Sequence, residues 1–189
     1  MARWALLSSE KSDERVAVLH ALLARFRERG LRVAGFYQRK GRDAEERKLF
    51  ELVRLSDAVQ SVVLAVGGIT PRKPQDESFC DYAFSAEGFA TAAAWLRSDG
   101  DGADLLVLDA VSKLESAGKG HAQSVRWALG RSDAQVVLLS GRQSQLPGIV
   151  EAFALDVEQV VGALELPVSA SDLDAFVEAV AAVGAAGTR

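Results

Sequence analysis

The sequence predicts one α/β domain over residues 1–189, with three layers and a doubly wound, mostly parallel sheet. Near the N-terminus an apolar run, an amphipathic segment and a second apolar run follow one another, which is the pattern of a βαβ unit. Further on, runs such as Leu105–Leu108 are continuously apolar, as strands covered by helices on both faces require. The alternation of such runs with helical segments continues almost to the C-terminus.

The opening unit consists of a strand at Trp4–Leu7, a helix that begins at Glu14, and a second strand at Leu31–Phe36. Gly30 ends the helix, since glycine readily adopts the conformation that follows a helix C-terminus. The two strands are expected to run parallel because a helix joins them. Apolar residues at spacings of three and four define the buried face of the helix: Val16, Leu19, Leu22, Leu23 and Phe26.

The middle of the chain departs from this alternation. Lys48–Leu55 and Ser61–Val66 have the composition of strands, and we expect them to pair as an antiparallel hairpin or edge ribbon inserted after the second strand. Gly67–Ser78 contains Pro71 and Pro74 and is the most loop-like segment. Residues 48–78 are therefore interpreted as an insertion of hairpin and loop within the same domain.

Regular alternation returns in the second half of the chain. We expect helices at 86–97, 122–129 and 146–153, and a C-terminal helix that is capped by Ser169 or Ser171 and ends near residue 183. Strands are expected at 104–109 and 134–139, and residues 157–166 hold a last strand or a short helix and a strand. The tail, residues 184–189, is expected to fray.

Composition and charge exclude several classes of protein. The formal net charge is −4, so we expect no nucleic-acid partner and no attraction to an anionic membrane. No apolar run approaches the roughly 20 residues that span a bilayer. Cys80 is the single cysteine beside two histidines, which excludes an internal disulfide and argues against a structural zinc site. A cytoplasmic location is expected.

The loop after the first strand is one of two places where chemistry is expected, because ligands of a doubly wound sheet bind at the carboxyl ends of its strands. Lys11 and Ser12 lie between strand and helix, like the Lys-Ser/Thr pair of a phosphate-binding P-loop. The loop has no glycine, however, and Glu10 places an acid where phosphate oxygens would lie. At about 4 Å and an effective dielectric constant of about 20, that repulsion is roughly 4 kcal/mol. Helix capping and a weakened anion site both stay open.

The second place follows the strand that ends at Asp109. An aspartate there is typical of a Walker B residue that organises magnesium, although Ala110 lacks the second carboxylate that hydrolytic sites use to orient water. Glu115 and His121 lie further along the same rim as candidates for acid–base chemistry. The alternative for the whole stretch is a polar loop that leads into a helix.

Cationic side chains are expected to gather at the same crevice. Arg39, together with its neighbour Lys40, follows the second strand and either contacts an anion or belongs to a solvated turn. The candidates for binding phosphate or another anion are Lys11, Ser12, Arg39, Lys113 and Lys119.

Two runs carry a resemblance to a known family. Leu105–Glu115 resembles the D-E-I-G-K-M-E segment of the thermophile nucleoside-triphosphatase family of P-loop NTPases, and Gly30–Gln38 resembles that family's second strand. The resemblance is closer to a branch with a degenerate P-loop that is often encoded near molybdate-uptake genes. Its G-K-x-E-x-x-G-x-G pattern corresponds to Ser112–Gly120, and its Cys-x-x stretch is similar to Cys80–Tyr82.

The resemblance implies the P-loop NTPase fold and, for the parent family, slow magnesium-dependent hydrolysis of nucleoside triphosphates. By position, Lys11 and Ser12 correspond to the phosphate and magnesium residues, and Asp109 to the Walker B aspartate. Ser12 and Asp109 would then hold magnesium only with a bound nucleotide. Because the Walker A motif is degenerate, we expect a pseudoenzyme, that is, a nucleotide- or anion-binding or regulatory module with little or no hydrolysis.

Two alternatives stay open. One is an active magnesium-dependent nucleoside triphosphatase in which Asp109, Glu115 and His121 are catalytic. The other is a protein-interaction module with a vestigial crevice. The sequence leaves the ligand, a nucleotide or a small oxyanion, undetermined, and it does not identify a protein partner or a cofactor other than magnesium with a nucleotide.

Overall fold

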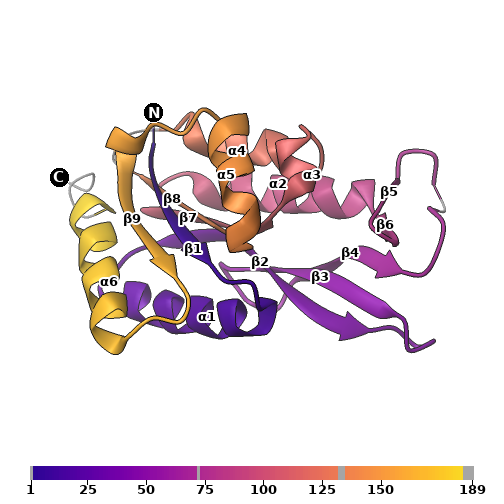
Figure 1. Ribbon diagram of the computed structural model, residues 1–189, viewed down its shortest axis with the longest axis horizontal. Helices are drawn as coiled ribbons and strands as arrows, with labels where there is room; N and C mark the ends of the chain where they lie inside the picture. The colour runs from indigo at the N-terminus through magenta and orange to yellow at the C-terminus, as the bar shows by residue number, and fades with distance from the viewer. Residues whose placement is uncertain (1, 72, 132–134, 185–189) are drawn as a thin grey trace.

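A nine-stranded sheet runs through the described part of the chain, with strands in the order β5-β6-β4-β3-β2-β7-β8-β1-β9 (Figure 1). The structure is a computed structural model that describes residues 2–71, 73–131 and 135–184. Helices cover both faces of the sheet, so the predicted three-layer α/β architecture is confirmed. None of the helices in these residues has the length and apolar character needed to cross a membrane.

The sheet is mixed, with a parallel half and an antiparallel half of similar size. The parallel half consists of β1 (Arg3–Ser8), β2 (Val33–Arg42), β7 (Leu105–Val111), β8 (Val136–Gly141) and β9 (Val160–Glu165). The antiparallel half, here called the wing, consists of β3 (Lys48–Arg54), β4 (Ser61–Gly67), β5 (Glu77–Phe79) and β6 (Tyr82–Phe84).

The prediction of a mostly parallel sheet was therefore wrong. Strand β2 is longer than expected: residues 33–36 pair with β7, and residues 36–42 continue beyond it and pair with β3. The segment Gly67–Ser78, expected to be a loop, includes the start of β5. Strands β5 and β6 are joined by Cys80 and Asp81, which both have positive φ, 47° and 63°, as a tight hairpin turn requires.

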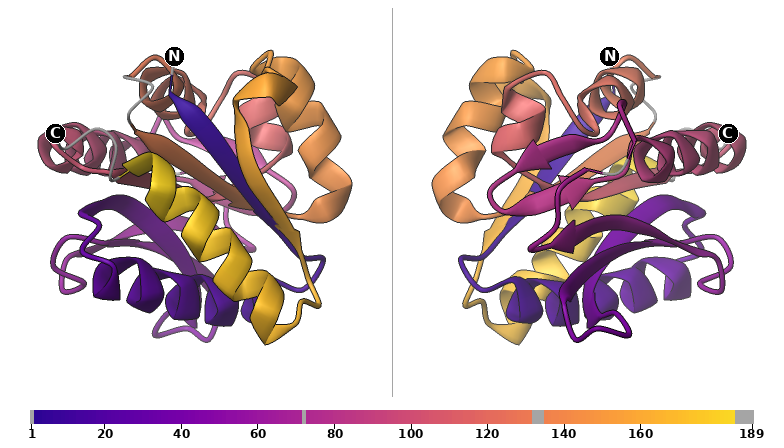
Figure 2. Two further views of the ribbon diagram at one scale, coloured as in Figure 1. Left: turned by 90° about the vertical axis from the view of Figure 1, so that its left-hand side faces the viewer. Right: turned by 90° about the vertical axis from the view of Figure 1, so that its right-hand side faces the viewer.

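The helices divide between the two faces. Figure 2 shows α1 (Ser12–Glu28) and α6 (Ala170–Gly184) together on one face. The other face carries α2 (Ala86–Gly100), α3 (Lys113–Ser116), α4 (Ala122–Leu129) and α5 (Leu146–Ala152). Single 3-10 turns, η1 (Gln143–Gln145) and η2 (Val157–Gln159), precede α5 and β9. Ser169 is the cap of α6, since its hydroxyl accepts the Asp172 N–H at 3.2 Å. The expected frayed tail lies outside the described residues except for Gly184, the last residue of α6.

Two apolar cores lie on opposite faces of the sheet, and the central strands contribute to both. In β7, Leu106 and Leu108 pack under α2, α4 and α5, whereas Leu105 and Val107 pack against α1 and α6. Successive side chains of a strand point to opposite faces, so a strand covered on both faces must be apolar throughout. This explains the continuous apolar run and places the end of β7 between the two helical layers.

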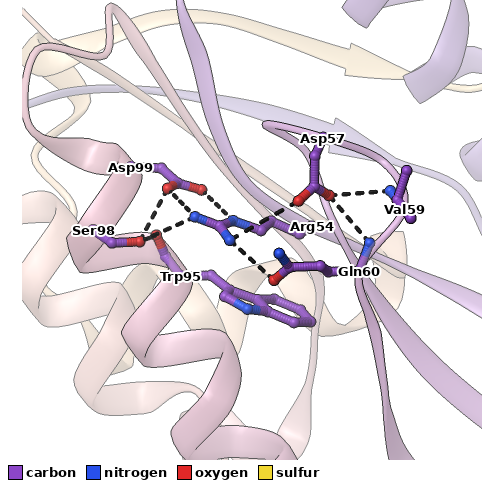
Figure 3. A network of polar contacts seen from close by, with 7 residues as sticks. All are labelled: Arg54, Asp57, Val59, Gln60, Trp95, Ser98 and Asp99. Carbon is purple, nitrogen blue, oxygen red and sulfur yellow. Dashed lines mark hydrogen bonds and ion pairs between the residues drawn. The ribbon is translucent and has the colours of Figure 1, made fainter.

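Arg54, at the end of β3, joins the wing to α2 (Figure 3). Its Nε donates to Asp99 Oδ2 at 2.8 Å, and its Nη1 donates to the Gln60 side-chain oxygen at 3.0 Å. Most of both charged side chains is buried, with 19% of Arg54 and 12% of Asp99 exposed. The hydrogen bond from Arg54 lowers the pKa of Asp99 to about 2. The pair fixes α2 against the wing.

Asp99→Asn is expected to lower the free energy of unfolding by about 1–3 kcal/mol, because the mostly buried guanidinium of Arg54 loses its charged acceptor. Asp101→Asn is the matched control, since the Asp101 side chain is 79% exposed and its pair with Arg131 lies at the surface. That control is expected to lose no more than about 0.5 kcal/mol. Urea unfolding measures both variants, and equal losses would contradict the account.

Candidate functional site

Asp109 lies near the carboxyl end of β7, and both oxygens of its carboxylate accept hydrogen bonds from protein donors. Oδ1 accepts from Arg15 Nε at 3.1 Å and from the Ser140 hydroxyl. Oδ2 accepts from the backbone N–H of Gln38 at 2.9 Å. The Arg15 and Asp109 side chains are 4% and 0% exposed. Elements α1, β2, β7 and β8 therefore meet at one buried ion pair.

Arg15 reaches Asp109 because it lies on the inner face of α1. Leu19, Leu22 and Phe26 follow it at helical spacing and are fully buried. The apolar spacing predicted Val16 as the first residue of this face, but Val16 is only partly buried, whereas Arg15 is 3% exposed. The sequence did contain a sign of this ion pair, because Arg15 lies four residues before Leu19 and so falls on the apolar face of the helix. A charge that is buried on such a face needs a partner.

The donor set around Asp109 does not fit a magnesium ion. Magnesium requires carboxylate oxygens free to coordinate it, and both Asp109 oxygens already accept from protein donors. The Ser12 hydroxyl, predicted as the second ligand, donates instead to Asp13 at 3.4 Å. Across residues 2–71, 73–131 and 135–184, no group of three or more His, Cys, Asp or Glu side chains is placed to hold a metal ion.

The charged groups of the first loop also have protein partners. Glu10 Oε1 accepts the backbone N–H of Ser144 at 2.7 Å, and this hydrogen bond is the main reason why the pKa of Glu10 is lowered. Lys11 Nζ donates to Glu14 at 2.8 Å. The carboxylate of Glu10 thus satisfies an amide of turn η1, a role that a bound anion often has at a helix N-terminus.

The predicted anion-binding cations do not form one cluster. Arg39 pairs with Glu51 at 2.8 Å, and Lys119 pairs with Glu77 at 3.2 Å. Lys113 is exposed on α3. Lys11 lines an open hollow of about 440 Å³ that it shares with Lys40 and Arg142 but also with three acids, Glu10, Asp13 and Glu14. Because acidic and basic side chains are present in equal number, this hollow is a poor binding site for phosphate.

Glu115 is buried and holds the loop between β7 and α4 closed. Its Oε2 accepts from the Ser112 N–H at 2.7 Å and from the Ser112 hydroxyl at 2.9 Å, while Oε1 accepts the His121 N–H at 3.0 Å. Burial raises the pKa of Glu115 in spite of these hydrogen bonds. Gly120 permits the arrangement, since its φ is +55° and a Cβ there would lie 2.4 Å from Glu115 Oε1.

His121 precedes α4 and is 3% exposed. Its ring lies 4.5 Å from that of Phe36 and 4.7 Å from that of Phe89, centroid to centroid. Neither ring nitrogen has a hydrogen-bond partner within the described residues. Burial alone lowers the pKa of His121 to about 3, so the imidazole is neutral at physiological pH.

A cavity of about 280 Å³ lies beside the Arg15–Asp109 pair, between the wing and the ends of β7 and β8. It brings together three of the predicted site residues, Ser12, Glu115 and His121. Asp109 does not line it but accepts hydrogen bonds from Arg15 and Gln38, which do, and Lys11, Arg39, Lys113 and Lys119 do not line it. Polar residues of the lining that the prediction did not name as site residues include Arg15, Gln38, Ser112, Arg142 and Gln145. Lys40 was named only as a neighbour of Arg39.

The sequence matches the family model described as "Protein of unknown function (DUF2478)" over residues 4–145. The chain belongs to the DUF2478 family. No curated protein matches it. The matched region of this DUF2478 chain includes the loops that follow β1 and β7, together with Arg15, Asp109 and His121.

Two solved structures have a similar fold. The solution structure of a human cancer-related nucleoside triphosphatase is 18% identical, with a TM-score of 0.66 and 100% of each chain covered. The crystal structure of THEP1 from the hyperthermophile Aquifex aeolicus is 16% identical, with a TM-score of 0.59. The match covers 94% of this chain and 95% of the THEP1 chain. These likenesses confirm for this DUF2478 member the nucleoside-triphosphatase fold that the resemblance implied.

The burial of His121 predicts a pH dependence of stability. The pKa of about 3 in the folded protein lies below the ordinary value of 6.5, so only the unfolded chain takes up a proton near neutral pH. The contribution of His121 to the free energy of unfolding is therefore fully present above pH 6.5 and is lost as the pH falls toward 3. Between pH 8 and pH 5 the loss is about 2 kcal/mol.

His121→Phe is the matched control for this prediction, because it keeps an aromatic ring between Phe36 and Phe89 and cannot titrate. Urea unfolding at several pH values is expected to show that wild type loses about 2 kcal/mol more than the variant between pH 8 and pH 5. Parallel pH profiles for the two proteins would contradict the prediction.

Proposed function

We propose that this protein is a nucleotide- or anion-binding or regulatory module of the nucleoside-triphosphatase fold, with little or no hydrolysis. The observation that carries the proposal is the buried ion pair of Arg15 and Asp109. An internal guanidinium neutralises the carboxylate that would otherwise organise magnesium. With Ala110 in place of a second acid, the position after Asp109 also lacks a carboxylate to orient water.

The energetics of the pair support this proposal. Removing one partner of a buried ion pair costs about 3–5 kcal/mol, because the other charge is left without compensation. A magnesium ion at Asp109 would have to displace Arg15 and leave that guanidinium buried near a divalent cation. The Coulomb repulsion adds to the desolvation cost, so binding of a magnesium–nucleotide complex at this carboxylate is strongly disfavoured.

A binding role for the crevice is supported by what surrounds the pair. The cavity of about 280 Å³ opens beside the carboxyl ends of the parallel strands, where ligands of doubly wound sheets bind. Besides Arg15, whose charge is paired with Asp109, two cationic side chains line it, Lys40 and Arg142. The proposal includes a cytoplasmic location and, from the resemblance to the branch encoded near molybdate-uptake genes, molybdate among the oxyanions to be tested.

The hydrolysis part of the proposal is tested by single-turnover assays with ATP and GTP in the presence of magnesium. We expect no turnover above that of buffer, because no metal is organised at Asp109. Asp109→Asn is the control for contaminating enzymes. Hydrolysis by wild type that Asp109→Asn abolishes would contradict the proposal and favour an active triphosphatase.

The binding part is tested by thermal unfolding with a panel of nucleotides, phosphate, sulfate and molybdate. A ligand at 100 times its dissociation constant is expected to stabilise the protein by about 2.7 kcal/mol. Loss of that stabilisation in Arg142→Ala would assign the ligand to this crevice. No stabilisation by any member of the panel would contradict the proposal and favour an interaction module.

A further inference from the structure

The two edges of the sheet differ in how well they are protected against another chain. β5 forms one edge, and it has only three residues, of which Glu77 is paired with Lys119. β9 forms the other edge with six residues, and its single charged residue, Glu165, is the last (Figure 1). Short strands, lysine and proline are devices by which proteins keep an edge from pairing with another chain. β9 is longer than β5 and contains neither lysine nor proline, so it is the edge open to a further strand.

Backbone groups of β9 point outward from this edge. The Leu166 N–H donates to the Ser8 carbonyl at 2.9 Å, and the Ser8 hydroxyl donates to the Leu164 carbonyl at 3.3 Å. Because alternate residues of a strand direct their N–H and C=O groups to opposite sides, those of Ala163 and Glu165 point away from β1. Within residues 2–71, 73–131 and 135–184 these outward groups have no hydrogen-bond partner. They are therefore available to the backbone of an added strand.

An apolar hollow lies beside this edge and is here called the edge hollow. It has a volume of about 540 Å³ and lies between α5 and β9. Leu146, Pro147 and Val150 of α5 line it, together with residues of β1 and β9. Val157 and Val160, just before β9 and at its start, are 71% and 40% exposed. A strand that paired with β9 would direct every second side chain toward the face that carries the edge hollow.

The rim of the edge hollow is acidic. Glu151 and Glu165 line it and are exposed, and no lysine or arginine among the described residues lines it. Glu165 accepts a hydrogen bond from the uncharged side chain of Gln143. The surrounding sequence has the same character, since residues 143–188 contain seven acidic residues and no lysine, arginine or histidine. This rim attracts a cationic partner.

The same charges argue against a second copy of this chain as the partner. Pairing of β9 with the β9 of another copy would bring two acidic rims together, and such a juxtaposition of like charges is unfavourable. The occupant that complements this edge is a cationic chain.

We propose that β9 and the edge hollow bind an extended segment of another protein, with apolar residues at alternate positions and lysine or arginine at the others. The segment adds to the sheet as a further strand. Its backbone pairs with Ala163 and Glu165, its apolar side chains lie over Val150, and its cations meet Glu151 and Glu165. The inference does not depend on the proposed function, because no residue of the edge hollow lines the cavity beside the Arg15–Asp109 pair.

Fluorescence anisotropy of the full chain with short labelled peptides of equal length tests the inference. The first peptide alternates lysine and valine, the second has glutamate in place of each lysine, and the third has proline in place of the central valines. The lysine–valine peptide is expected to bind tenfold or more tightly than either of the others, because it alone has both the charge and the backbone donors. Absence of binding by it, or equal binding by another peptide, would overturn the inference.

Hydrogen exchange measured by NMR tests strand addition itself. The amides of Ala163 and Glu165 are expected to exchange at least tenfold more slowly when the lysine–valine peptide is bound, since they then donate to its carbonyls. A peptide that binds and leaves both amides unprotected would contradict the proposed mode of binding.

Ala163→Pro removes the outward N–H and no hydrogen bond to β1, a position where an edge strand tolerates proline. It is expected to weaken binding of the lysine–valine peptide tenfold or more with little change in Tm. Ala163→Ser is the matched control, because it keeps the N–H and is expected to keep the affinity. Equal affinities of the two variants would contradict a role for this backbone group.

Glu151→Gln tests the charge of the rim without altering the strand. It is expected to weaken binding of the lysine–valine peptide several-fold and to reduce the dependence of that binding on salt. Glu28→Gln is the matched control, since Glu28 is an exposed acid on α1 that does not line the edge hollow. Equal effects of the two variants would show a general charge effect and overturn the recognition of cations at this rim.

Light scattering after size-exclusion chromatography tests the alternative occupant. The chain alone is expected to be a monomer, in agreement with the repulsion between two acidic rims. A dimer that Ala163→Pro dissociates would show that a second copy covers β9, and the proposal of a cationic partner would then be wrong.

Discussion

The buried ion pair between Arg15 and Asp109 is the constraint on which the site depends. It joins the first helix to the end of the central strand, and the carboxylate also accepts hydrogen bonds from the Gln38 backbone N–H and the Ser140 hydroxyl. A charge buried to this degree must be compensated from within, because water cannot reach it. Here the compensating cation is part of the chain, so the edge of the sheet that organises a metal in a triphosphatase is closed by the protein itself.

The wing forms part of a cavity at the same edge. Because β2 continues past the parallel half and pairs with β3, four antiparallel strands extend the sheet, and the side chains of Phe50, Tyr82 and Phe84 line the cavity. The cavity thus has an aromatic wall on one side and the ends of β7 and β8 on the other. Glu115 and Gly120 fix the loop that carries His121, so the imidazole is held in this wall rather than exposed to solvent.

Local patterns predicted much of the fold. Helix α4 lies at the predicted residues 122–129, and the strand that ends the βαβ unit and the buried strand before Asp109 were found from their apolar runs. The wing was harder, because the Cys80-Asp81 turn lacks the asparagine–glycine signal of a two-residue hairpin. The site was more difficult to predict than the wing. Its residues Arg15, Gln38, His121 and Arg142 are far apart in sequence, and only the order of the strands in the sheet brings them together. A buried arginine on an apolar helix face was the one local sign of the ion pair.

A double-mutant cycle on Arg15→Met and Asp109→Asn, measured by urea unfolding, tests the central claim most directly. Each single variant is expected to lose about 3–5 kcal/mol, and the double variant to lose less than the sum by about 2–3 kcal/mol, since the second substitution removes the charge left unpaired by the first. Losses that add within about 0.5 kcal/mol would show that the two side chains are not coupled. The internal counter-ion, and with it the explanation for a closed metal site, would then be wrong.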